Sequence, residues 1–290
     1  MELLPFALVV ASAFSHATWN VLAKGGADKE SFMWLMTVTS LFTLIPVFYV
    51  FMPYWGLPLK AVPFLLLSGV AETLYFLSLS RAYELGDLSL VYPLARSSPL
   101  FITVVAVVLL GEKVTPWGYV GILLIVLGVY MIHLRGLSSG ELAMPLRSLG
   151  SRASQFALLT AVWTTMYSLS DKLGVAIMDP VVYAFWLEPF ILLIMTPVVI
   201  WRRGWGTVAQ EWRMAKVRVT VAGFLTRFGY ILVLVAMSLV QVSYILALRQ
   251  VSVVLGALAG VLLLKERYGR VRILSSAIIF IGVYILGVLA

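Results

Sequence analysis

Ten apolar stretches divide this 290-residue chain, and each is close to the roughly 20 residues that a helix needs to cross a bilayer. Many of the connections between them are only four to eight residues long, which forces neighbouring helices to run antiparallel. The pattern predicts an all-α integral membrane protein with ten transmembrane helices. The predicted spans are 3–23, 31–53, 62–84, 88–111, 116–135, 154–176, 180–201, 217–239, 242–264 and 269–289.

Composition agrees with lipid as the solvent for most of the surface. Only 12% of the residues are charged and 62% are hydrophobic, whereas a soluble domain carries about a quarter charged residues. No glycine- or proline-rich linker sets off a second module, so we expect one transmembrane domain. Met1 and Glu2 precede the first apolar stretch without a basic segment, which favours a retained helix over a signal peptide.

The chain also contains an internal repeat. The motif Leu-Leu-Gly-Glu-Lys at 109–113 corresponds to Leu-Leu-Lys-Glu-Arg at 263–267, an offset of 154 residues. Gly-Val-Tyr at 128–130 and at 282–284 keeps the same offset. It also pairs Ala82 with Ala236, Leu85 with Leu239, Ser89 with Ser243 and Leu94 with Leu248.

These identities predict two five-helix repeats, residues 1–135 and 154–290, joined by a loop at 136–153. Because five is an odd number, the second copy must be inverted in the membrane relative to the first. We expect the function to lie where the two copies meet.

Basic residues predict the orientation. Fifteen lysines and arginines fall in or beside the odd-numbered connections, whereas the even-numbered ones hold only Lys60, Lys113 and Lys172. Basic loops stay on the cytoplasmic side, so both termini are expected on the non-cytoplasmic side. This rule also accounts for the net charge of +8, and no basic stripe with interleaved aromatics indicates nucleic acid as a partner.

Five charged residues lie inside the predicted helices: Glu72, Arg96, Glu188, Arg227 and Arg249. Each costs roughly 2.5–3.5 kcal/mol to insert without a partner, so these side chains must face the bundle interior or water. Under the repeat offset, Glu72 corresponds to Thr226, beside Arg227, which would allow an acid and a base to pair between the two copies.

Two interpretations of these charges are open. They could be structural ion pairs that set helix register, or they could bind a ligand. Three arginines against two glutamates leave an excess positive charge, which suits an anionic or zwitterionic ligand with a carboxylate, phosphate or phosphonate. Asp171 and Lys172 could lie near enough to change this balance.

The first helix carries a polar face over two turns, formed by His16, Asn20 and Lys24 at i, i+4 spacing. This face should line a cavity or a helix contact, and Trp19 lies beside it. Deep aromatic residues could form an apolar wall around a small organic solute, or could simply be core packing. They are Tyr75, Trp163, Tyr167, Trp186 and Tyr230.

No motif for catalysis, a metal or a cofactor is visible. The chain lacks cysteine, has two histidines, and contains neither a metalloprotease motif nor a phosphate-binding loop. We therefore expect no enzymatic activity, no catalytic residues and no nucleotide-driven pump.

The Trp19-Asn20 pair with Lys24, the Leu-Gly-Glu-Lys motif at 110–113 and Gly-Val-Tyr at 282–284 resemble the EamA-type members of the drug/metabolite transporter superfamily. The resemblance covers essentially the whole chain. It implies an inner-membrane carrier of small metabolites, with a central cavity lined by both halves and the fifth and tenth helices at the periphery. Members of the family are commonly described with cytoplasmic termini, which is the opposite of what the basic residues predict here.

The resulting hypothesis is a secondary transporter, an exporter or exchanger, of small polar metabolites such as amino acids or other charged organic solutes. A proton or a counter-substrate is the candidate coupling partner, the bilayer is the other partner, and a monomer is expected. A polytopic enzyme acting on a lipid-linked substrate and a structural subunit are the alternatives. The candidate substrate-binding residues are Trp19, Asn20, Glu72, Tyr75, Arg96, Trp163, Tyr167, Trp186, Glu188, Arg227, Tyr230 and Arg249.

Overall fold

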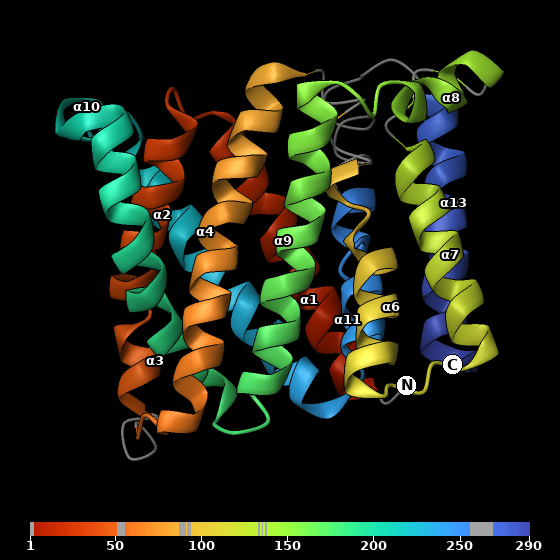
Figure 1. Cartoon of the computed structure of the whole chain (residues 1–290), viewed down its shortest axis with the longest axis horizontal. Coiled ribbons are helices and arrows are strands. Elements are labelled where there is room, and N and C mark those ends of the chain that lie inside the picture. The colour runs from red at the N-terminus through yellow and green to blue at the C-terminus, as the bar shows by residue number, and fades with distance from the viewer. Residues whose placement is uncertain are drawn as a thin grey trace.

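A computed structural model describes residues 3–50, 56–86, 91, 94–132, 134, 136, 138–255 and 269–290. Its helices stand side by side as one bundle (Figure 1). They are α1 (Leu3–Lys24), α2 (Lys29–Thr43), α3 (Ile45–Val50), η2 (Leu59–Ala61), α4 (Val62–Leu85), α6 (Ser98–Leu110), α7 (Pro116–Met131), α8 (Ser139–Arg147), α9 (Arg152–Gly174), α10 (Pro180–Leu239), α11 (Val242–Leu248), α13 (Gly269–Tyr284) and η3 (Ile285–Leu289). The second copy of the repeated motif, at 263–267, lies outside the described residues.

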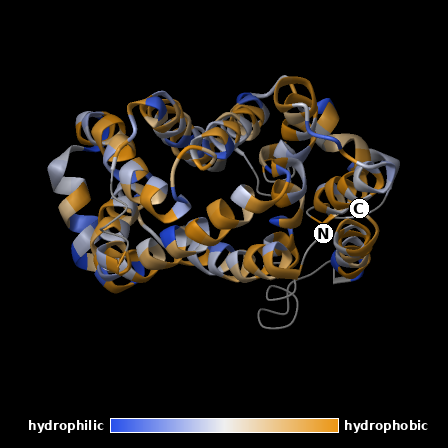
Figure 2. Ribbon diagram, turned by 90° about the horizontal axis from the view of Figure 1, so that it is seen from below, coloured by the Kyte–Doolittle hydropathy of each residue, from blue (hydrophilic) through white to orange (hydrophobic). Residues whose placement is uncertain are grey.

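Four described helical segments are long and apolar enough to cross a membrane: Leu3–Ala23, Leu59–Ala82, Pro180–Leu239 and Arg270–Leu289. Three shorter apolar helices, Ser98–Leu110, Pro116–Met131 and Val242–Leu255, accompany them. Apolar residues, orange in Figure 2, dominate most of the helices. Large apolar side chains also face outward, such as Val108, which is 72% exposed. The chain is thus a helical, multi-pass membrane protein, and the count of ten crossings stays a prediction.

The structure corrects two predicted connections. α10 consists of two helices that meet at Gly204, where the backbone is not helical (φ 74°, ψ 156°). Most of the segment 202–216 is therefore helix and not a loop, because the second of these helices begins directly after Gly204. Gly tolerates this positive φ because it has no Cβ. The bend is necessary, since 60 helical residues in line would measure about 90 Å, three times the hydrocarbon thickness. The predicted loop 136–153 contains a helix of its own, α8.

The larger helix contacts join the first half of the chain to the second: α4 packs on α9, α1 and α2 on α10, and α7 on α13. The α7–α13 contact is close at its glycines. A Cβ added to Gly282 would lie 2.8 Å from the Gly121 carbonyl oxygen, and one added to Gly128 would lie 2.9 Å from that of Ser275. The 154-residue offset exchanges these two contacts, since it relates Gly128 to Gly282 and Gly121 to Ser275.

The two ends of the bundle differ. The chain termini lie at one end, and α8 and the bend of α10 lie at the other (Figure 1). At the bend, Arg203 forms ion pairs with Glu30 and Glu84, each with a 3.0 Å N–O distance. It thereby ties α10 to the start of α2 and the end of α4. Arg202 reaches the same Glu30 carboxylate at 3.0 Å.

Helix breaks position two of the intramembrane arginines. α6 begins only at Ser98, with Pro99 in its first turn, where a missing N–H costs nothing. Arg96 lies in the turn just before it. α11 ends at Leu248, and Arg249 is its C-cap. Such interruptions are typical of membrane proteins where the backbone lines a cavity.

Candidate functional site

Two adjoining cavities lie inside the bundle. The first is lined by residues of both halves of the chain, including eight predicted site residues: Trp19, Glu72, Tyr75, Tyr167, Glu188, Arg227, Tyr230 and Arg249. The second contains Arg96 and shares Tyr75, Tyr167 and Arg249 with the first. These residues were far apart in the sequence, and the fold brings them together.

Three predicted residues lie away from both cavities. Asn20 donates a 2.8 Å hydrogen bond from Nδ2 to the carbonyl oxygen of His16, within its own helix. Trp163 and Trp186 are partly buried and pack against the core. The structure therefore gives all three a packing environment in this conformation.

The first cavity is small, with about 40 Å³ of space for water molecules, and the second has about 20 Å³. One water needs roughly 10–15 Å³ by this measure, whereas binding pockets for organic ligands usually enclose about 300–1,000 Å³. In this conformation the site holds a few waters' worth of space. This space is too small for an organic ligand of ordinary size.

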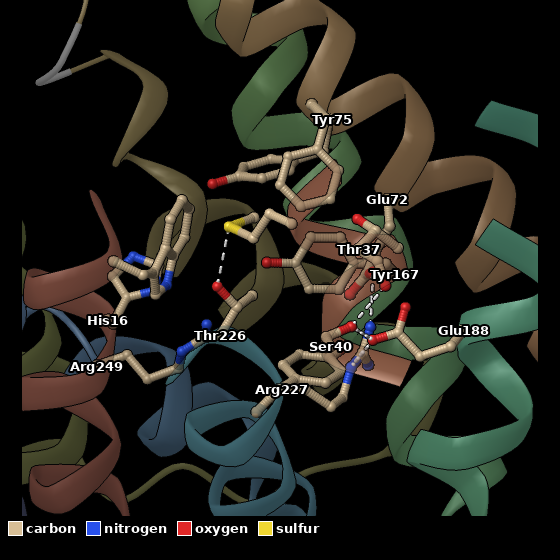
Figure 3. A pocket seen from close by; sticks show the side chains of 14 residues that line it. His16, Thr37, Ser40, Glu72, Tyr75, Tyr167, Glu188, Thr226, Arg227 and Arg249 are labelled. Atoms are coloured by element: carbon tan, nitrogen blue, oxygen red, sulfur yellow. Dashed lines mark hydrogen bonds and ion pairs between the residues drawn. The ribbon is translucent and has the colours of Figure 1, made fainter. Parts of the chain in front are cut away.

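Acidic residues gather at one end of the first cavity, around Arg227 (Figure 3). Arg227 Nε donates to the carboxylate of Glu188, which also accepts a hydrogen bond from Ser40 Oγ. The predicted partner Glu72 is farther away, with its Oε2 4.0 Å from Arg227 Nη2. Arg227 and Glu188 are almost completely buried, and among the described residues Arg227 Nη1 and Glu188 Oε2 find no hydrogen-bond partner.

Asp171 is a buried residue that was not among the predicted binding residues. The sequence analysis considered it only because its charge could change the balance between the arginines and glutamates inside the helices. Its Oδ1 accepts hydrogen bonds from Ser68 Oγ at 2.6 Å and Tyr183 Oη at 2.9 Å, and its Oδ2 accepts from Tyr230 Oη. An acidic residue near the end of a predicted membrane helix was the available signal. The hydroxyl groups replace a cation as the partners of this carboxylate.

Its neighbour Lys172 points elsewhere. Lys172 Nζ donates to the carbonyl oxygens of Met237 and Val240 at 2.5 and 2.8 Å. It therefore caps the end of α10, where carbonyl groups have no intrahelical partner. Lys172 does not contribute its charge to the acidic end of the cavity.

Nitrogen donors gather at the opposite end of the cavity, where His16 and Arg249 lie (Figure 3). Arg96 Nη2 lies 2.8 Å from His16 Nε2, and Trp19 Nε1 lies 3.2 Å from His16 Nδ1. His16 was predicted to belong to a polar helix face but not to the substrate site. Its proximity to Arg96 arises only from tertiary packing, because the two residues are 80 positions apart.

Aromatic rings separate the two ends. The ring centroids of Tyr75 and Tyr167 are 5.8 Å apart, and those of Tyr167 and Tyr230 are 6.4 Å apart. The guanidinium carbons of Arg227 and Arg249 lie 5.1 and 6.0 Å from the centroid of Tyr230, within the range of cation–π attraction. The cavity thus has an acidic end, an aromatic middle and a basic end. Within the described part of the chain, no group of three metal-ligating side chains accompanies them.

Fold and cavity together define a helical membrane protein whose interior site is shared between two halves of the chain. The family model of the EamA-like transporter family matches residues 3–134 and 152–288, so the chain belongs to this transporter family. The two separate matches confirm the duplicated unit. One solved crystal structure shares the fold, with a TM-score of 0.70 and 17% identity over 98% of this chain and 99% of that one. The comparison with curated proteins gave no match.

Proposed function

We propose that this protein is a secondary transporter that moves small charged organic solutes, such as amino acids, across the inner membrane by alternating access. One observation carries the proposal: the central cavity draws its lining from both family-matched halves, for example Glu72 and Tyr75 from one and Arg227 and Arg249 from the other. A rocking motion of one half against the other would open such a cavity to each side in turn.

The reciprocal glycine contacts between α7 and α13 support an inverted arrangement of the two halves. An inverted repeat has a pseudo-twofold axis in the membrane plane, and a contact on one side of that axis recurs on the other with its partners exchanged. The pairs Gly121–Gly282 and Ser275–Gly128 have this relationship. We therefore infer two inverted five-helix repeats, each crossing the membrane five times.

The small cavity also supports the proposal. Two cavities with room for only a few waters, yet lined by Glu72, Glu188 and the three arginines Arg96, Arg227 and Arg249, suit a closed conformation of a site that binds polar solutes. A lipid-linked substrate would instead require charged residues near one face of the bundle and an entrance from the lipid. Coupling by a proton or by a counter-substrate uses the same cavity.

Cysteine labelling tests alternating access without knowledge of the substrate, because the chain contains no cysteine. The variants Thr37→Cys and Thr226→Cys each place one thiol in the cavity lining. We expect a membrane-impermeant maleimide to label each thiol both in right-side-out and in inside-out vesicles. Val182→Cys, at a core position with no exposed surface, should stay unlabelled, and Arg213→Cys, at an exposed position, should be labelled from one side only.

Labelling of both cavity thiols from only one side, or from neither, would contradict alternating access. The substrate class is then sought by counterflow into proteoliposomes with amino acids, organophosphonates, sugar phosphates and nucleotide sugars. Concentrative exchange of at least one of these solutes is the expected result.

A further inference from the structure

His16 is surrounded by more hydrogen-bond donors than its ring can accept. Trp19 Nε1 lies 3.2 Å from His16 Nδ1, and Arg96 Nη2 lies 2.8 Å from His16 Nε2. An indole N–H and a guanidinium can only donate. A neutral imidazole carries one N–H and one acceptor nitrogen, so only one of these contacts can be a hydrogen bond. In the other contact, an N–H group of the ring points at an N–H group of its neighbour.

Protonation of His16 would make this conflict worse, since both ring nitrogens would then be donors. The conflict is relieved when an oxygen acceptor enters and takes the surplus N–H. His16 lines the first cavity, so such an acceptor can arrive from the cavity.

Arg249 adds a second guanidinium to this end. It lines both cavities and is partly exposed within them. Among the described residues it forms no ion pair, although its guanidinium lies 6.0 Å from the ring of Tyr230. A guanidinium so placed binds oxygen anions well because its fork of N–H groups matches their geometry.

The nearby acidic groups are occupied at the other end of the cavity. Glu188 is paired with Arg227, and Glu72 lies 4.0 Å from the same guanidinium. Asp171 accepts from three hydroxyl groups. Figure 3 shows Glu188 and Arg227 on one side of the aromatic residues and His16 and Arg249 on the other.

We propose that the solute carries an oxyanion, a carboxylate, phosphonate or phosphate group, which binds between His16, Arg96 and Arg249. This inference rests on the proposed transport function and names its substrate class. One oxygen accepts the surplus N–H at His16, and the other oxygens accept from the guanidinium of Arg249. The solute body then lies against Tyr75 and Tyr167, which border both cavities.

The test is a binding measurement on the purified protein with matched probes: succinate against succinamide, methylphosphonate against its dimethyl ester, and glucose 6-phosphate against glucose. Each pair keeps the body of the molecule similar and removes the charge. We expect at least one anion to raise the melting temperature and its neutral counterpart to leave it unchanged. The anion that binds identifies which oxyanion the site prefers.

The variant Arg249→Gln should weaken binding of that anion by about tenfold or more, because a fork of charge-assisted hydrogen bonds is lost. Arg249→Lys keeps the charge without the fork, so its affinity for the anion should lie between those of the unchanged protein and Arg249→Gln. If Arg249→Gln does not fold, the lysine variant takes its place in the test. Arg213→Gln makes the same charge change at an exposed position and should bind normally.

Three results would overturn the proposal: neutral probes that bind as well as the anions, normal anion binding in the Arg249 variants, or no binding of any of these anions at 10 mM, about ten times a dissociation constant of 1 mM. The cysteine labelling separates this inference from the transport function. Labelling from both sides without anion binding would leave a transporter of another substrate class. Anion binding with labelling from one side only would leave a binding site without alternating access.

Discussion

Arg227 and Glu188 pair across the two arms of α10, and they are 39 positions apart in the chain. Both residues are buried, and their side chains are 5% and 1% exposed. The pair therefore fastens the arms of the bent helix to each other beside the central cavity. In the part of the chain that the structure describes, Arg227 Nη1 and Glu188 Oε2 have no hydrogen-bond partner.

Removing one member of this pair should harm the protein more than removing both. Arg227→Met leaves a buried carboxylate without its cation, which costs about 3–5 kcal/mol. The double variant Arg227→Met/Glu188→Leu removes the Glu188 charge together with its cation, leaves only the longer 4.0 Å contact to Glu72 unmatched, and should recover part of that loss. Melting temperatures of the purified variants give the comparison. A double variant whose loss equals the sum of the single losses would show that the two residues act independently.

The Arg203 network should matter more than the neighbouring surface pair. Arg203→Gln breaks the ion pairs to Glu30, which is 2% exposed, and to Glu84, and should cost about 1–3 kcal/mol. Arg81→Gln breaks an exposed i, i+3 pair with Glu84 and should cost less than about 1 kcal/mol. Thermal unfolding of the two variants tests this order, and equal melting temperatures would contradict it.

Glu112, the acid of the repeated motif, caps a helix of the other half. Its carboxylate accepts from Val242 N at 2.7 Å and from Ser243 N and Oγ at 3.3 and 2.6 Å, at the start of α11. Gln241, the N-cap residue itself, makes no side-chain capping bond. Glu112→Ala should therefore cost about 1–2 kcal/mol, as loss of a cap does. In a double-mutant cycle with Ser243→Ala, the two losses should fall short of additivity, whereas strict additivity would argue against the contact.

Gly282→Ala should destabilise the α7–α13 contact. The new Cβ would lie 2.8 Å from the Gly121 carbonyl oxygen, and a backbone atom cannot rotate away as a side chain can. Overpacking of this kind costs about 1–3 kcal/mol. Gly206→Ala is the matched control, since its Cβ would meet nothing within 4 Å, and it should be neutral or slightly stabilising. Similar melting temperatures for the two variants would contradict the close contact.

The orientation of the chain can be measured with fusions to the C-terminus. Both termini lie at the end of the bundle opposite the arginine-rich bend of α10 (Figure 1). If the basic end is cytoplasmic, a C-terminal alkaline phosphatase should be active and a C-terminal green fluorescent protein dark. The same fusions placed in the exposed stretch around Arg213 should give the reverse result. A bright C-terminal fluorescent fusion would place the C-terminus in the cytoplasm and contradict the orientation predicted from the basic residues.

Much of the fold could be predicted because membrane helices follow simple rules. The apolar stretch 3–23 became α1 and 62–84 became α4, since length and hydropathy alone decide where a chain can cross lipid. The repeated Gly-Val-Tyr motif predicted the duplication that the family matches confirm. The prediction was incomplete at 202–216, which the predicted spans leave as a connection and which is mostly helix apart from the kink at Gly204. A helix that reaches beyond the apolar layer carries the same residues as a loop, so composition does not distinguish them.

In the candidate site, too, the sequence determined one part and the tertiary structure the other. Sequence alone identified the costly intramembrane charges, Glu72, Arg96, Glu188, Arg227 and Arg249, because burial of any ionisable group in lipid requires a reason. Which groups meet was decided by the tertiary structure: Glu188 hydrogen-bonds Arg227, Glu72 reaches the same guanidinium at the longer distance of 4.0 Å, and Arg96 lies beside His16. A helix in isolation can rotate about its axis at no cost in backbone hydrogen bonds. Only packing against its neighbours, through close approaches such as Gly121 to Gly282, sets that rotation and so selects the partner of each charge.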